Sequence, residues 1–167
     1  MASLLPQDYE LVAVDALSLH PDNPRQGDVG AIHESIAANG FYGALVVQRS
    51  TGHVLVGNHR LQAAAHAGVA ELPVVWVDVD DDRARRILLA DNRSGDLASY
   101  DEGRLADLLS ELAAGEDGLA GTAWDGEDLD RLLADARPPE GFPEVDENLE
   151  TEHRCPKCGY EWSGASS

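Results

Sequence analysis

Positive charge is scarce in this sequence of 167 residues. It holds 12 Lys and Arg against 31 Asp and Glu, which gives a formal net charge of −19. Proteins that take their affinity from the DNA backbone release counterions with many Lys and Arg side chains. The charge balance therefore argues against a protein that wraps DNA, and it predicts that any DNA contact is made in a small local groove or through a partner protein.

Long apolar runs are missing as well. No stretch approaches the run of about eighteen apolar residues that a membrane-spanning helix needs. The N-terminal segment MASLLPQDYE lacks the basic region and apolar run that are typical of a secretory leader. We therefore expect a cytoplasmic protein with no membrane partner.

Cysteine is almost absent, because Cys155 and Cys158 in HRCPKCGYEW are the only two. Cys-Pro-x-Cys-Gly before an aromatic residue resembles one knuckle of a zinc ribbon, in which the turn places both thiolates on one Zn²⁺ ion. A complete site needs four ligands. His153 is a candidate for the third, and a second chain in a homodimer is a candidate source of the others. The alternatives are a remnant that binds no metal and a labile disulfide.

The most informative stretch is VLVGNHRLQAAAHAG, residues 54–68. Its pattern predicts a buried strand over residues 54–56, a turn at Gly57 and a helix over residues 61–67 that a glycine ends. Free N–H groups and the positive end of the helix dipole meet at such a turn and attract an anion. Gly57 lets an anion approach the backbone, and Arg60 offers two donors to phosphate oxygens. We predict a phosphate cradle; the alternative is an ordinary corner with a solvated Arg.

His59 lies beside Arg60 in this stretch, and it is the candidate catalytic residue. At the predicted turn it is placed to donate to a phosphate oxygen or to act as an acid-base group near neutral pH. His20, before a proline-rich loop, and His66, on an Ala-rich helix, are expected to be structural or exposed. Residues 41 and 42, Phe and Tyr, are candidates to stack on a base, with a place in the core as the alternative.

The segment GNHR, with LQAAAHAGVAELPVVWVD behind it, resembles the GERR-type box of ParB N-terminal domains and the GCHR-type motif of sulfiredoxins. Gly57 and Arg60 match both patterns, and His59 matches the sulfiredoxin pattern. Asn58 stands where sulfiredoxin has its reactive cysteine, so no thiolate is available for sulfiredoxin chemistry. The resemblance implies that these four residues bind the phosphates of a nucleotide.

The loop PDNPRQGD carries Arg25 in a rigid setting. Its two prolines exclude regular structure. ParB-type domains have a similar Asn-Pro-Arg turn after the first strand, and the resemblance implies that Arg25 helps to line the nucleotide site. The alternative is that Arg25 stabilises a turn or pairs with an acid. The loop leads into a helix predicted over residues 28–39, which Gly40 ends.

The stretch LLADNRSGD, residues 88–96, resembles the ENxxR-type box of ParB domains, in which an acid and an Asn approach the Mg²⁺ of a nucleoside triphosphate. Asp91 and Asn92 are the matching positions. Oxygen ligands suit Mg²⁺, which keeps several of its waters. Arg93 is a further candidate for the phosphates, although the Arg of the usual box comes later in the sequence. The alternative for Arg93 is a helix C-cap network.

The residues between these two motifs bear mainly on the fold. The run from Leu72 to Val77 is rich in β-branched residues and predicts a strand, which Pro73 favours at a sheet edge or at its own first positions. Four acids follow within residues 78–82. They predict either oxygen ligands for a divalent cation or complementation of the dipole of the next helix.

The rest of the chain is acidic, with 18 acids and three Arg over residues 96–152. Apolar residues at helical spacing predict one helix around residues 105–112 and another over 128–136, which pack on the first domain or on a second subunit. Neither has the basic, turn-linked pattern of a helix-turn-helix, so we expect no DNA-reading domain of that type.

These patterns predict a compact α/β domain with a small mixed sheet, of ParB N-terminal or sulfiredoxin-like type, followed by acidic α-helices and a short cysteine-containing tail. The expected segments are a nucleotide-binding domain over 8–98, an acidic helical extension over 99–136, a linker over 137–152 and half of a zinc-ribbon-like knuckle over 153–162.

The resemblance implies a role in DNA metabolism with a bound nucleoside triphosphate, CTP or ATP, and Mg²⁺, and with hydrolysis as a further step. Proteins of this kind without a helix-turn-helix often occur in phages and plasmids and are commonly labelled ParB-like nucleases. The alternatives are a metal-dependent DNA nuclease and a non-catalytic adaptor that dimerises and recruits a DNA-processing partner.

Overall fold

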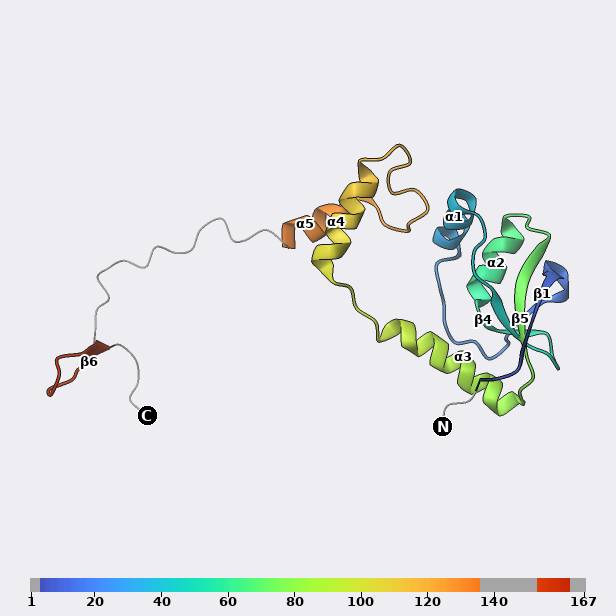
Figure 1. The fold of residues 1–167 in the computed structure, drawn as a ribbon, viewed down its shortest axis with the longest axis horizontal. Helices are drawn as coiled ribbons and strands as arrows, with labels where there is room; N and C mark the ends of the chain where they lie inside the picture. Colours follow the sequence, from blue (N-terminus) through green and yellow to red (C-terminus); the bar gives the residue numbers. More distant parts are fainter. Residues whose placement is uncertain (1–3, 136–152, 163–167) are drawn as a thin grey trace. The chain divides into compact units, whose positions relative to one another are not determined.

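The structure is a computed structural model that describes residues 4–135 and 153–162. The chain divides into two compact units, residues 1–134 and 135–167 (Figure 1). The strands of the first unit are β1 (Gln7–Ala13), β2 (Ser18–Leu19), β3 (Leu45–Gln48), β4 (His53–Val56) and β5 (Glu71–Val77). The helices are α1 (Val29–Asn39), α2 (Asn58–His66), α3 (Asp81–Asp96), α4 (Glu102–Ala113) and α5 (Gly126–Asp135), with a 3₁₀ turn over Val14–Ala16.

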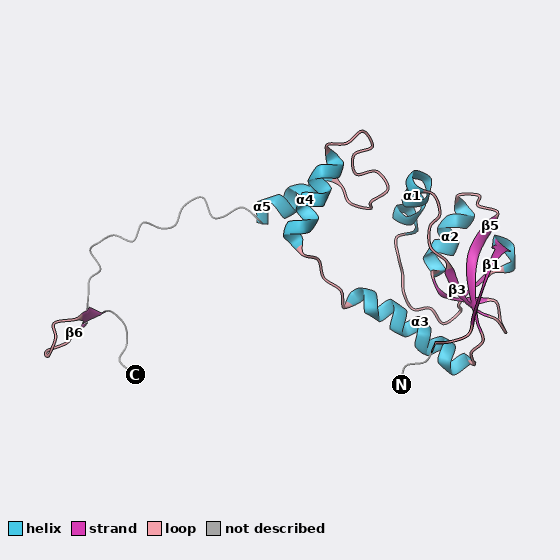
Figure 2. Cartoon of the chain, in the orientation of Figure 1, coloured by secondary structure: helices cyan, strands magenta, loops and turns pink. Residues whose placement is uncertain are grey.

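The five strands form one mixed sheet in the order β1-β5-β3-β4-β2. β1 pairs antiparallel with β5, and β5 pairs parallel with β3. β3 pairs antiparallel with β4, and β4 pairs parallel with β2. Helices follow the strands β2, β4 and β5 along the chain, and the unit combines helices with the sheet (Figure 2). The predicted α/β class and the small mixed sheet are therefore confirmed.

Of the two positions that the sequence favoured for Pro73, a sheet edge or the first positions of its strand, the structure has the second, because Pro73 is the third residue of β5. β5 lies between β1 and β3, inside the sheet. The parallel pairing with β3 begins only at Val74, which lies opposite Leu45, so at Pro73 the strand has only β1 as a neighbour. A proline without an N–H group is tolerated there because a second ladder has not yet begun.

The larger of two buried core clusters lies between the sheet and α2. Leu45, Val54 and Leu72 of the sheet are fully buried and pack with Leu61 and Ala64 of α2. Small side chains on α2 let the helix approach the sheet closely. The junction between β4 and α2 is therefore held by buried residues on both sides.

Several helices begin at a capping Asp or end at a glycine, as the local sequence predicts. Asp28 caps α1 by accepting a hydrogen bond from the N–H of Ala31 at 3.0 Å, and Gly40 ends the helix with a φ of 75°. Asp80 caps α3 by accepting from the N–H of Arg83 at 2.8 Å. The acids around Asp80 therefore serve the start of α3, which agrees with the helix-dipole interpretation.

α2 begins at Asn58, three residues before the start that was predicted at residue 61. The apolar pattern starts at Leu61, because His59 and Arg60 are polar and do not contribute to it. The earlier start matters, since it places the GNHR residues on the first turn of a helix.

The acidic helices belong to the first unit. Asp101 caps α4 by accepting from the N–H of Arg104 at 3.1 Å. The loop between α4 and α5 contacts α1, because the side-chain amide of Asn39 donates to the carbonyl of Gly121 at 3.1 Å. Among the helices of the described residues, none has the length and apolar character to span a bilayer.

The described part of the second unit is a short hairpin of β6 (His153–Arg154) and β7 (Glu161–Trp162). The N–H of Cys155 donates to the carbonyl of Tyr160 at 2.7 Å, and the N–H of Gly159 donates to the carbonyl of Cys155 at 2.9 Å. The predicted knuckle segment is therefore a hydrogen-bonded turn from Cys155 to Gly159 between two strands, and it contains both cysteines.

Candidate functional site

A cavity of about 580 Å³ lies at the corner between β4 and α2. Its walls come from α1, from this corner, from the second half of α3 and from the loop between α4 and α5. The volume is typical of a small-molecule site. The residues predicted for the nucleotide site, with one exception, line it: Arg25, Gly57, Asn58, His59, Arg60, Asp91 and Asn92.

Gly57 makes the sharp turn into α2. Its φ is 98°, in the left-handed region, and a Cβ at this position would lie 2.5 Å from a methyl carbon of Leu45. The first backbone bond inside the helix runs from the N–H of Leu61 to the carbonyl of Gly57. The N–H groups of residues 58–60 therefore have no acceptor within the helix, as expected for a first turn. They face a region where the helix dipole favours negative charge.

Arg60 lies across the two glycines of this corner. A Cβ on Gly43 would lie 2.9 Å from Nη1 of Arg60, and a Cβ on Gly57 would lie 3.1 Å from its Nη2. The Arg60 side chain is half-buried and lines the cavity. Within the described residues it forms no ion pair or hydrogen bond, although most arginines there pair with a carboxylate. A half-buried cation without a partner creates a positive site in an acidic protein.

His59 fixes the loop that precedes α1. Its Nε2 atom lies 3.0 Å from the backbone nitrogen of Gly27 and 3.1 Å from the carbonyl oxygen of Arg25. One tautomer accepts from Gly27, and the other donates to Arg25. A Cβ on Gly27 would lie 2.9 Å from Nδ1 of His59, so the close contact needs a glycine. The ring thus has a structural contact, and its catalytic role stays a prediction.

The side chain of Asn58 is buried and already satisfied. Its Oδ1 atom accepts from the N–H of His20 at 2.9 Å, and its Nδ2 atom donates to the carbonyl of Val54 at 2.9 Å. Only 6% of the residue is exposed. Its contribution to an anion in the cavity is therefore limited to the backbone N–H.

Arg25 is tied to the second half of α3. Its Nη1 atom donates to the carbonyl of Asn92, and its Nη2 atom lies 3.1 Å from a carboxylate oxygen of Asp96. The side-chain amide of Asn92 donates to that of Asn23 at 3.1 Å. Arg25 therefore lines the cavity and also pairs with an acid. These are the two interpretations that the sequence left open for it.

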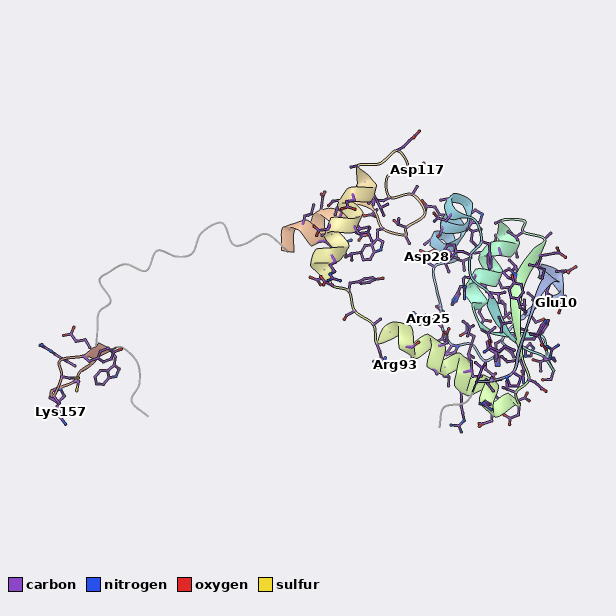
Figure 3. The ribbon with its side chains drawn as sticks, in the orientation of Figure 1. Glu10, Arg25, Asp28, Arg93, Asp117 and Lys157 are labelled. Atoms are coloured by element: carbon purple, nitrogen blue, oxygen red, sulfur yellow. The ribbon has the colours of Figure 1, made fainter. Side chains whose placement is uncertain are left out.

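Asp91 and Arg93, the other two residues of the DNR segment, differ in whether they line the cavity. Asp91 is exposed, lines the cavity and forms no ion pair within the described residues. Arg93 is also exposed on α3 but does not line the cavity (Figure 3). Its carbonyl accepts from the N–H of Leu97, which is the helix C-cap arrangement.

The sequence patterns missed one wall of the cavity, residues 121–123 in the loop between α4 and α5. Gly121 has a φ of 73°, and Ala123 has a φ of 62°, the one positive value at a non-glycine residue in the described part of the chain. Backbone strain of this kind persists where the surroundings hold it. No local motif signals a wall that is built by a contact with α1 more than 80 residues away.

No group of three or more His, Cys, Asp or Glu side chains that would hold a metal ion occurs in the described segments. Cys155 and Cys158 are free thiols. Hydrogen bonds from the backbone N–H groups of Lys157 and Cys158 to its sulfur lower the pKa of Cys155, which favours the thiolate.

The fold and the cavity define a small α/β domain with an anion-attracting corner between a strand and a helix. The profile of the ParB N-terminal domain family matches residues 7–93. The chain therefore belongs to the ParB N-terminal domain family.

Relatives of this chain are ParB proteins. A probable plasmid-partitioning protein ParB from Thermus thermophilus is 41% identical over 86 residues, which cover 48% of this chain and 29% of that protein. The chain thus matches less than a third of the length of this relative.

A solved ParB structure shares the fold. The C-terminally truncated chromosome-partitioning protein ParB from Caulobacter crescentus, complexed with CTP-gamma-S, superposes with a TM-score of 0.66 at 18% identity, over 80% of this chain and 81% of that chain. A sulfiredoxin from Arabidopsis thaliana is 17% identical, with a TM-score of 0.40, over 48% of this chain and 97% of that chain.

Proposed function

We propose that the cavity binds a nucleoside triphosphate with Mg²⁺, and that this binding controls a role of the protein in DNA partitioning or a related step of DNA metabolism. The observation that carries the proposal is the half-buried guanidinium of Arg60, which lines the cavity without a carboxylate partner in the described residues. A cation in this setting is stabilised by an anionic ligand.

The phosphates would lie against the first turn of α2. Free N–H groups of residues 58–60 and the dipole of the helix favour negative charge there. Arg60 adds a fork of donors to the same place. Arg25 would contribute less, because Asp96 and the carbonyl of Asn92 already occupy its donors.

Mg²⁺ fits this arrangement as a companion of the phosphates. Asp91 supplies a carboxylate at the cavity, and Asn92 adds an amide oxygen beside it. Two oxygen ligands from the protein are typical for Mg²⁺, which takes its other ligands from phosphates and water. The ion would neutralise phosphate charge, and Asp91 would help to hold it.

CTP is the first nucleotide to test. The Caulobacter ParB of similar fold was solved with CTP-gamma-S, and Phe41 and Tyr42 line the cavity in this chain, where aromatic rings can stack on a base. The relation to a plasmid-partitioning protein supports the role in DNA partitioning. The net charge of −19 favours DNA contact through a partner or a small groove.

Calorimetric titration of the whole chain with CTP, ATP and GTP, each with Mg²⁺, tests the proposal. We expect saturable binding of one nucleotide. Arg60→Ala should weaken it by about 10- to 100-fold, since a hydrogen bond to a charged group contributes about 1.5–3 kcal/mol. Arg86→Ala is the matched control, because Arg86 is an exposed arginine of α3 that pairs with Asp82 and does not line the cavity.

The outcomes separate the functional alternatives. Binding of none of the three nucleotides by a folded protein would contradict the proposal and favour the adaptor. Phosphate release measured in the same samples, with His59→Ala alongside, tests hydrolysis. Plasmid cleavage that survives purification and disappears in Asp91→Asn would instead establish a nuclease.

A further inference from the structure

We propose that Cys155 and Cys158 form half of a zinc site, and that the same two cysteines of a second copy of the chain complete it. The site would hold Zn²⁺ with four thiolates and link two chains through their hairpins. It is independent of the nucleotide cavity, which lies in the other unit of the chain.

The turn of the hairpin has the geometry of a metal-binding knuckle. The N–H of Gly159 donates to the carbonyl of Cys155 at 2.9 Å, and Gly159 has a φ of 78°. The backbone N–H groups of Lys157 and Cys158 are directed at the sulfur of Cys155. A thiolate that binds a metal needs such donors, because they spread its negative charge. Both thiols are free, and Cys158 is exposed.

The metal ligands in this sequence fall short of a four-ligand site, and a second copy of the hairpin supplies the missing ones. A structural zinc site is tetrahedral with four ligands. The whole sequence contains two cysteines, and the described residues contain no group of three metal-binding side chains. Two copies of the hairpin, related by a two-fold axis, together supply four thiolates. Two-fold symmetry is the commonest symmetry of protein dimers.

The charge of the hairpin suits this ligand set. Zn²⁺ with four thiolates carries a net charge of −2, counting four negative charges against two positive ones. Lys157, the one lysine of the sequence, lies between the two cysteines along the chain, so two copies would bring two such cations to the site. Arg154 is paired with Glu161 at 3.5 Å, so Lys157 is the cation of this segment without a partner among the described residues. The lysines would offset the charge of the metal centre.

Metal content and mass of the purified whole chain test the proposal. The protein is kept under a phosphine reductant to exclude disulfides, loaded with Zn²⁺, freed of excess metal and analysed by elemental analysis and light scattering. We expect 0.5 Zn²⁺ per chain, since one ion is shared by two chains, and the mass of a dimer. Titration with Co²⁺ should end at the same ratio, with the absorption of a tetrahedral four-thiolate site.

Variants identify the ligands. Cys155→Ser and Cys158→Ser should each lose the metal, whereas Lys157→Ala and His153→Ala, which keep both thiols, should retain it. Copies with two different tags should co-purify with Zn²⁺ and separate after chelation. One Zn²⁺ per chain in a monomer, loss of metal in His153→Ala, or no uptake of either metal would overturn the proposal. Cys155→Ser should leave nucleotide titrations unchanged, so this test does not depend on the proposed nucleotide site.

Discussion

Asn58 and His20 are joined by a buried hydrogen bond, in which the side-chain oxygen of Asn58 accepts from the backbone N–H of His20 at 2.9 Å. The amide nitrogen of Asn58 donates to the carbonyl of Val54 at 2.9 Å. One side chain thus ties the start of α2 both to β4 and to the loop that leads to Arg25. The position that the family resemblance assigns to a ligand residue is therefore a structural anchor of the cavity.

Asn58→Ala should destabilise the protein. It leaves the N–H of His20 and the carbonyl of Val54 without their partner in a buried place, and each such loss costs about 1–3 kcal/mol. We expect the free energy of unfolding, from urea titrations, to fall by roughly 2 kcal/mol. The control is His66→Ala at the exposed end of the same helix, which should change it by less than about 0.5 kcal/mol. Equal losses in the two variants would contradict the anchoring role.

Gly57→Ala should be more harmful than Gly68→Ala. Both residues have a left-handed φ, of 98° and 73°, so both substitutions incur the cost of about 1–2 kcal/mol for an alanine in that conformation. A Cβ at Gly68 meets nothing within 4 Å, whereas a Cβ at Gly57 would lie 2.5 Å from Leu45 and 3.1 Å from Arg60.

The free energy of unfolding of Gly57→Ala should therefore fall by a further amount of about 1–3 kcal/mol, which is the usual cost of overpacking. The substitution should also reduce nucleotide affinity, because Arg60 must move. Urea titrations and calorimetry of both variants measure the two effects. An equal loss of unfolding free energy in Gly68→Ala and Gly57→Ala would show that the contacts at Gly57 do not affect stability.

Stability should fall below neutral pH through His20. Burial, followed by the nearby His53, lowers the pKa of His20 from its ordinary value near 6.5. The folded protein then binds a proton less readily than the unfolded chain. The stabilising contribution is complete above about pH 6.5 and is lost as the pH falls from there toward the lowered pKa.

His20→Asn isolates this effect. The Nδ1 atom of His20 accepts from the N–H of Asp22 at 3.1 Å, and an Asn oxygen can take the same role without titrating near neutral pH. Urea titrations at pH 7.5 and pH 5.5 should show a smaller drop in the free energy of unfolding for the variant than for the wild type. Equal drops would show that His20 does not titrate in this range.

The parts of the fold that the sequence predicted correctly depend on short-range signals. Gly40 and Gly57 lie at turns with positive φ, and Asp28 and Gly40 bound α1, because caps and turns are set by residues next to each other. The choice between an edge and a strand start for Pro73 stayed open in the sequence because strand order is a long-range property. A proline limits one ladder of hydrogen bonds but does not say where that ladder lies in the sheet.

The site was predicted less completely than the fold. The GNHR segment and the first two residues of the DNR segment, Asp91 and Asn92, line one cavity, whereas Arg93 does not. The individual roles depend on partners far away in sequence, such as His20 for Asn58 and Asp96 for Arg25. A local pattern contains no information on such partners, so it does not distinguish the unpaired guanidinium of Arg60 from the paired one of Arg25.

Gly121 controls the wall of the cavity that the α4-α5 loop forms. Its carbonyl accepts from the side-chain amide of Asn39 on α1, and its φ is 73°. A Cβ at Gly121 would lie 2.6 Å from Ala38 and 2.7 Å from the amide nitrogen of Asn39. Because the loop and α1 are in such close contact, Gly121→Ala should push the loop away from α1 and open the cavity.

Gly118→Ala is the matched control in the same loop. Gly118 has a φ of 57°, and nothing lies within 4 Å of its Cβ position, so that substitution incurs only the cost of the left-handed conformation, about 1–2 kcal/mol. On the proposed function, Gly121→Ala should weaken nucleotide binding about tenfold, which corresponds to about 1.4 kcal/mol of binding free energy, because the displaced wall loses contact with the ligand. Gly118→Ala should keep the affinity of the wild type. Calorimetry measures the nucleotide affinity of both folded variants. An equal affinity of the two variants would mean that the loop does not contribute to nucleotide binding.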